Sequence, residues 1–166
     1  TIAFGVKDVG FSYWLLNYYN QCLGLSPARA STALFVALLF DAVFDVLIGH
    51  CSDNLRTVWG RRHPLMYASA IPTALCNLAL WCPPASAVAA QDRLFAWLLG
   101  ASVLVRMSVS LNEIPSAALV AELTAGYDAR TSLVALRSFF GWMGGVSLHV
   151  LLQTVLLHPS APGARD

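Results

Sequence analysis

The chain has 166 residues, of which 57% are hydrophobic and only 11% are charged, and its mean hydropathy is +0.63. Soluble domains carry about a quarter charged residues, so this composition excludes an ordinary soluble domain and indicates an integral membrane protein. The ten basic and nine acidic residues nearly cancel, which argues against a nucleic-acid-binding surface and hence against a nucleic-acid partner.

Five apolar segments follow one another along the chain, each about 20 residues long as a membrane-spanning helix requires. They cover residues 2–23, 30–51, 64–81, 94–119 and 133–157. We therefore predict an all-α membrane protein with an N-terminal transmembrane helical bundle over residues 1–158. The polar, Pro- and Gly-rich residues 159–166 are predicted to form a tail or external loop before a further helix. The chain is accordingly expected to be a fragment of a longer protein.

The connecting loops differ in their positive charge. Arg56, Arg61 and Arg62 all lie between the second and third segments, whereas the loops after the first and third segments hold only Arg29 and Arg93. Loops rich in Lys and Arg stay in the cytoplasm, so the loop with the three arginines is predicted to be cytoplasmic. Two spanning segments precede this loop, and we therefore predict that the N-terminus is cytoplasmic as well.

The sequence lacks the common motifs of disulfide, metal and enzyme active sites. The four cysteines lie in or beside apolar runs without C-x-x-C spacing, which predicts buried free thiols; they are Cys22, Cys51, Cys76 and Cys82. No nucleophile elbow, zinc-protease or phosphate-loop motif occurs, so we expect neither an enzyme nor a resident cofactor.

Seven charged residues fall within the apolar segments: Lys7, Asp8, Asp41, Asp45, Arg106, Glu113 and Arg137. Charges at such positions face a bundle interior or a water-filled cavity, and they usually pair. Static ion pairs that only hold the bundle together are the alternative.

Asp41 and Asp45 are the most informative of these charges. Separated by four residues, they share one helix face. Burying both requires a positive partner, which is a coupling cation, a proton or a basic side chain of a neighbouring helix. Lys7, Arg106 and Arg137 are the candidate internal counter-charges.

Several aromatic and glycine residues of the apolar segments can be interpreted either structurally or functionally. Trp14 suits either stacking on a sugar or plain packing, and Tyr18 and Tyr19 suit an interfacial aromatic belt or plain packing. Gly141 and Gly145 form a G-x-x-x-G pattern, which predicts a face of close helix packing.

Several stretches together resemble one family of transporters. Residues 41–45, with Gly49, Asp53 and the run 59–64, resemble its second helix and following loop, and residues 115–119, 122–124 and 127–131 resemble its fourth helix and loop. Residues 137–140 resemble the start of its fifth helix. The chain is thus similar to the glycoside–pentoside–hexuronide:cation symporters of the major facilitator superfamily, the melibiose permease-like transporters.

This resemblance implies a twelve-helix fold in two halves, of which the chain supplies the first five helices and lacks its C-terminal half. It further implies a bacterial inner-membrane location, with lipid around the helices. The implied cation ligands are Asp41, Asp45 and Ser110. The implied substrate-binding residues are Lys7, Asp8, Glu113 and Arg137. Trp14 is added to them as the ring that could stack on the sugar. The implied cytoplasmic gate comprises Gly49, Asp53, Arg61, Arg62, Glu122, Asp128 and Arg130.

The expected activity is cation-coupled symport of a sugar or glycoside by alternating access. Phe44 stands where the family often has a polar residue, which leaves the coupling cation open between Na⁺ and H⁺. The alternatives are a transporter of the same fold for a lipid or other amphiphile, a non-transporting membrane sensor or assembly protein, and, less favoured, an intramembrane enzyme.

Overall fold

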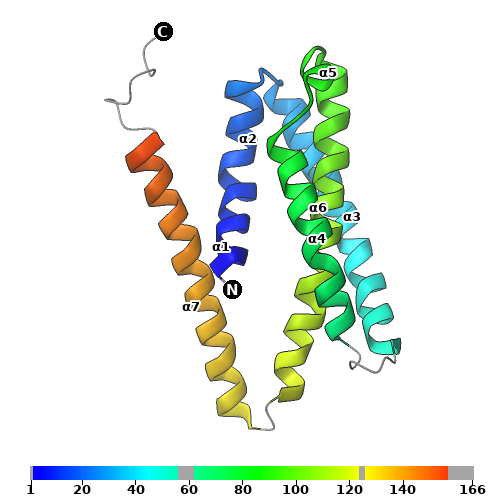
Figure 1. Cartoon of the computed structure of the whole chain (residues 1–166), viewed down its shortest axis with the longest axis vertical. Coiled ribbons are helices and arrows are strands. Elements are labelled where there is room, and N and C mark those ends of the chain that lie inside the picture. Colours follow the sequence, from blue (N-terminus) through cyan, green and yellow to red (C-terminus); the bar gives the residue numbers. More distant parts are fainter. Residues whose placement is uncertain (1, 56–61, 124–125, 157–166) are drawn as a thin grey trace. The chain divides into compact units, whose positions relative to one another are not determined.

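The computed structural model describes residues 2–55, 62–123 and 126–156, which are helical apart from short turns and contain no strand. The first helical stretch is continuous (Figure 1). Along its length it alternates between α- and π-helix. Its parts are α1 (Ile2–Val9), η1 (Gly10–Trp14), α2 (Leu15–Asn17) and η2 (Tyr18–Cys22). The later elements are α3 (Pro27–Asn54), α4 (His63–Trp81), α5 (Ala85–Val88), α6 (Gln91–Leu123), α7 (Tyr127–Leu151) and η3 (Leu152–Leu156).

These helices lie over each of the five apolar segments. Three are long and apolar enough to cross a membrane, namely Pro27–Asn54, Gln91–Val120 and Tyr127–Thr154. Polar and proline residues dilute the shorter α4, and π-helical turns divide the first stretch into short elements. Membrane crossing by these two stretches stays a prediction. The tail at 159–166 lies outside the described residues.

Local signals account for where the long helices begin. Gly24 has φ +71, a left-handed conformation that glycine adopts without a steric penalty, and it turns the chain between η2 and α3. Pro27 then opens α3 and Pro64 lies in the first turn of α4, where a missing N–H costs nothing. Pro115, by contrast, is fully buried inside α6, and the helix continues through it.

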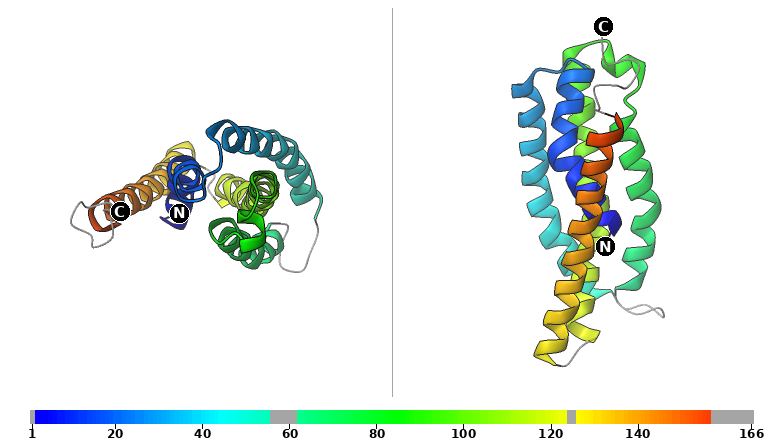
Figure 2. Two further views of the ribbon diagram at one scale, coloured as in Figure 1. Left: turned by 90° about the horizontal axis from the view of Figure 1, so that it is seen from above. Right: turned by 90° about the vertical axis from the view of Figure 1, so that its left-hand side faces the viewer.

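One structural unit contains α3, α4, α5 and α6. Both α3 and α4 pack on α6, which lies between them (Figure 2). The indole Nε1 of Trp97 donates to the carbonyl of Ala79 (3.2 Å), and Thr73 Oγ1 donates to the carbonyl of Ser108 (3.1 Å). Partners therefore move back along α4 as they advance along α6, so these two helices are antiparallel.

The other unit contains α1, η1, α2 and α7. A Cβ on Gly5 would overlap the backbone carbonyl of Gly141, and one on Gly145 would lie 2.6 Å from Val9 Cγ2 and 3.1 Å from the carbonyl oxygen of Gly5. The backbones of α1 and α7 thus touch where both lack side chains. This confirms the close packing predicted from the G-x-x-x-G pattern.

Of the two structural interpretations of Tyr19, the structure favours packing over an aromatic belt, because the ring is fully buried and its hydroxyl donates to the carbonyl of Leu80 (2.7 Å). The expectation that the cysteines are buried is wrong for three of the four. All four cysteines are free, but only Cys76 is even half-buried. Cys22, Cys51 and Cys82 are exposed because they lie at or near helix ends.

Candidate functional site

Asp41 is held from α6 at both of its carboxylate oxygens. Arg106 Nη1 lies 2.7 Å from Asp41 Oδ2, and the buried Ser110 hydroxyl donates to Asp41 Oδ1 at 3.1 Å. Arg106 and Ser110 are one turn apart on α6, so both reach the same carboxylate. The side chains of Arg106 and Asp41 are 24% and 18% exposed. The structure therefore joins two predicted cation ligands, Asp41 and Ser110, and selects Arg106 from the candidate counter-charges.

Asp45, one turn beyond Asp41 on α3, differs from it in hydrogen bonding. It is half-buried, and its Oδ1 atom is buried without a hydrogen-bond partner among the described residues. A desolvated carboxylate oxygen costs free energy until a positive charge or a donor reaches it. Of the two carboxylates, Asp45 is thus the one with a buried oxygen that no described donor reaches.

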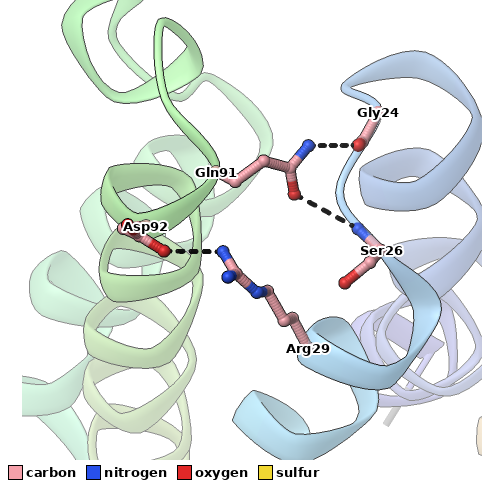
Figure 3. Close-up of polar contacts among 5 residues, drawn as sticks. All are labelled: Gly24, Ser26, Arg29, Gln91 and Asp92. Carbon is pink, nitrogen blue, oxygen red and sulfur yellow. Dashed lines mark hydrogen bonds and ion pairs between the residues drawn. The ribbon is translucent and has the colours of Figure 1, made fainter.

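Polar contacts at the helix starts set α3 and α6 side by side (Figure 3). Gln91 Nε2 donates to the carbonyl of Gly24 (2.5 Å), and the Ser26 amide donates to Gln91 Oε1 (3.4 Å). Arg29 Nη1 pairs with Asp92 Oδ1 at 2.6 Å. From these starts the two helices run in parallel, which brings Arg106 and Ser110 to the level of Asp41.

Gly49 and Glu113 lie further along the same two helices. A Cβ on Gly49 would lie 3.9 Å from Ile114 Cγ2, so this glycine faces α6 with room to spare. Glu113 is half-buried and follows Ser110 by one turn. Glu113 already has an interaction partner in the structure, so any substrate contact must compete with that partner.

An aromatic cluster lies in the other unit, at η1 and α7. The rings of Trp14 and His149 are 5.6 Å apart between centroids, and those of Tyr13 and His149 are 6.5 Å apart. Trp14 Nε1 is buried without a hydrogen-bond partner in the described part of the chain. The sequence alone does not indicate the contact of His149 with Trp14, because it depends on the register between two helices far apart in the chain.

The other predicted substrate-binding residues of this unit lie at different heights along its helices. Asp8 is exposed on α1, and Arg137 is half-buried on α7, one turn before Gly141. Since Gly5 packs on Gly141, Arg137 and Asp8 start about two turns apart along the bundle. Neither makes a hydrogen bond or ion pair to another described residue, whereas half-buried Lys7 has a partner.

The structure describes part of the predicted gate. Arg62 Nη2 lies 3.5 Å from Asp53 Oδ1, which joins the end of α3 to the start of α4. Asp128 and Arg130 are exposed in the first turn of α7. Arg61 and the side chain of Glu122 lie outside the described residues.

No group of three or more His, Cys, Asp or Glu side chains gathers as a metal site in the described part of the chain. Charged side chains lie within long apolar helices, where such residues usually mark a binding site or a transport pathway.

Comparison with known proteins gives the family. A family of proteins described as MFS/sugar transport protein matches residues 1–165. The chain belongs to this family of the major facilitator superfamily, whose members are transporters rather than enzymes.

Three relatives illustrate its range. An uncharacterized symporter of Synechocystis is 31% identical over 93% of this chain and 30% of its own length. The isoprimeverose transporter of Lactiplantibacillus pentosus is 25% identical over 84% of the chain and 29% of its own length. A sodium-dependent lysophosphatidylcholine symporter of Danio rerio is 32% identical over 48% of the chain and 15% of its own length. The chain thus spans about 30% of the first two relatives. No solved structure matches it.

Proposed function

We propose that this chain provides the first helices of a symporter that couples a monovalent cation, Na⁺ or H⁺, to uptake of a sugar or glycoside by alternating access. The observation that carries the proposal is the buried Oδ1 of Asp45, which has no hydrogen-bond partner in the described part of the chain and lies one turn from an Asp41 whose oxygens are both engaged. A buried carboxylate oxygen without a donor favours the protein state in which a cation reaches it.

Coupling requires that cation and substrate each bind one conformation better than the other. Ser110 touches Asp41, and Glu113 follows Ser110 by one turn on the same helix. A shift of α6 on cation binding would therefore move a substrate residue as well. This is the short physical path by which the cation could alter sugar affinity.

The second unit supplies groups suited to a sugar. Asp8 and Arg137 have no internal partner among the described residues, and Trp14 offers a ring with an unpartnered buried Nε1. Carboxylate, guanidinium and indole N–H groups can all hydrogen-bond to sugar hydroxyls. A sugar substrate also agrees with the family description and with the relative named for isoprimeverose.

The test is uptake by the complete gene product in proteoliposomes, with and without an inward Na⁺ or H⁺ gradient. We expect Asp45→Asn to bring the ratio of the two uptake rates close to one, because the amide no longer attracts a cation. The matched control is Asp92→Asn, at an exposed position in the contacts between helix starts, which should keep the wild-type ratio. An unchanged ratio in Asp45→Asn would exclude Asp45 from the cation site.

A lipid-like substrate is the second candidate, supported by the match to the lysophosphatidylcholine symporter over about half of the chain. Competition separates the two. If the substrate is a sugar, unlabelled isoprimeverose or another glycoside should reduce uptake of the labelled sugar, and lysophosphatidylcholine should not. Uptake of labelled lysophosphatidylcholine that no sugar inhibits would favour the lipid.

A further inference from the structure

Arg106 gives the cation site a property that the carboxylate pair alone would lack. Its guanidinium lies 2.7 Å from Asp41 Oδ2, between helices α3 and α6, where the two side chains are only 24% and 18% exposed. Ser110 occupies the other oxygen of Asp41. A mobile cation at Asp41 would therefore have to share that carboxylate with a guanidinium and a hydroxyl.

We propose that Arg106 is a tethered cation that permanently satisfies Asp41, so that the transporter binds one mobile positive charge per cycle, at Asp45. This inference rests on the proposed symport function and deepens it. It assigns unequal roles to two aspartates that the sequence presents as a matched pair: Asp41 is a structural anion and Asp45 is the coupling carboxylate.

The charge count supports this division. The two carboxylates contribute two negative charges and the guanidinium one positive charge, which leaves one negative charge on the cluster. The guanidinium belongs to the chain itself, so no ion gradient carries its positive charge away. The remaining negative charge matches a single Na⁺ or H⁺.

Covalent attachment explains why the guanidinium wins over a mobile ion at Asp41. Arg106 and Asp41 belong to one chain, so the effective concentration of the guanidinium at this carboxylate is of the order of millimolar or above. No ion has to leave bulk water for the contact to form. Its short contact to one carboxylate oxygen is a charge-assisted hydrogen bond, roughly twice as strong as a neutral one. Asp45 has no such partner among the described residues, and it is therefore where a mobile cation gains most.

A double-variant experiment in the complete gene product tests the assignment. The probe is the glycoside that the wild-type protein takes up fastest from a panel that includes isoprimeverose, and the readout is the ratio of uptake with and without the cation gradient. Asp41→Asn alone frees the guanidinium to neutralise Asp45, so the ratio should fall close to one. Asp41→Asn combined with Arg106→Gln removes both charges and should restore the ratio to within about threefold of wild type.

Arg106→Gln alone leaves two carboxylates and no guanidinium. We expect it to bind a second cation, so that the charge moved per glycoside, measured from the reversal potential, rises from one to two. Arg106→Lys keeps the positive charge and should move one charge like the wild type. If Arg106 only held α3 and α6 together, its substitution would leave the charge moved per glycoside unchanged. If Arg106→Gln does not fold, the role of Arg106 is still tested by Arg106→Lys and by the comparison of Asp41→Asn with the double variant.

The possible failures are distinguishable. If wild-type uptake does not respond to Na⁺ or H⁺, the symport proposal itself is wrong. If wild-type uptake responds but the double variant recovers no more coupling than Asp41→Asn, the tethered-cation assignment is overturned while symport stands. A wild-type stoichiometry of two charges per glycoside would also overturn it.

Discussion

At the scale of single residues, position on a helix does not decide how a carboxylate behaves. Asp41 and Asp45 share one face of α3, yet one is held at both oxygens and the other has a buried oxygen that no described residue contacts with a hydrogen bond. The difference comes from α6, which presents Arg106 and Ser110 at one level only. A mutation at Asp41 should therefore act through Arg106 and Ser110, whereas one at Asp45 alters a carboxylate that no described donor reaches.

The hydroxyl of Tyr19 supports a second prediction at this scale. It donates to the carbonyl of Leu80 at 2.7 Å from a fully buried ring. Tyr19→Phe leaves that carbonyl without this donor and should lower the free energy of unfolding by about 1 kcal/mol, measured as a lower melting temperature in detergent.

Tyr13→Phe is the matched control for Tyr19→Phe. Tyr13 is 63% exposed, and its hydroxyl makes no hydrogen bond to any described residue. The control should melt with the wild type. Equal melting of the two variants would show that the bond between Tyr19 and Leu80 contributes nothing to stability.

At the scale of elements, the helices could be predicted from the sequence but their registers could not. Apolar runs broken by Pro27, Pro64 and charged loops locate the helices to within a few residues. The ion pair of Arg106 with Asp41 joins residues 65 apart, and no local pattern states which turn of one helix meets which turn of another. The same holds for Trp14 and His149.

The π-helical turns also escaped prediction. The segments Gly10–Trp14 and Tyr18–Cys22 carry no composition that separates them from an ordinary apolar helix. Their i→i+5 hydrogen bonds rotate the face that follows, and such turns are frequent at functional sites. η1 places Trp14 against His149, which helical spacing alone would not have indicated.

The packing of α1 on α7 depends on glycine at one point. Gly5→Ala would drive a Cβ into the carbonyl of Gly141, which is backbone and cannot rotate away. The helices must separate, at an expected cost of about 1–3 kcal/mol. We expect a lower melting temperature in detergent and reduced uptake by the complete gene product.

Gly100→Ala provides the matched control for Gly5→Ala. A Cβ on Gly100, within α6, would meet nothing within 4 Å, and alanine favours helix over glycine. The control should therefore be as stable as the wild type or more so. Gly5→Ala with wild-type stability would contradict the close contact between α1 and α7.

At the scale of the whole molecule, the orientation in the membrane is open to a direct test with native cysteines. Cys22 and Cys82 lie at one end of their unit, because Tyr19 near Cys22 bonds to Leu80 near Cys82. Cys51 lies near the opposite end of α3. All three are exposed. The positive loop with Arg56, Arg61 and Arg62 predicts that the Cys51 end is cytoplasmic.

Three single-cysteine variants of the complete gene product, treated with a membrane-impermeant maleimide, convert this into a measurement. Applied to intact cells, the reagent should label the variants that retain Cys22 or Cys82 and leave the one that retains Cys51 unlabelled until the membrane is opened. Labelling of Cys51 alone from outside would invert the topology. Labelling of Cys51 and Cys82 from the same side would contradict a membrane crossing by α4, the helix whose composition leaves that crossing a prediction. Cys22 and Cys82 on opposite sides would contradict the bond between Tyr19 and Leu80 that joins their helix ends.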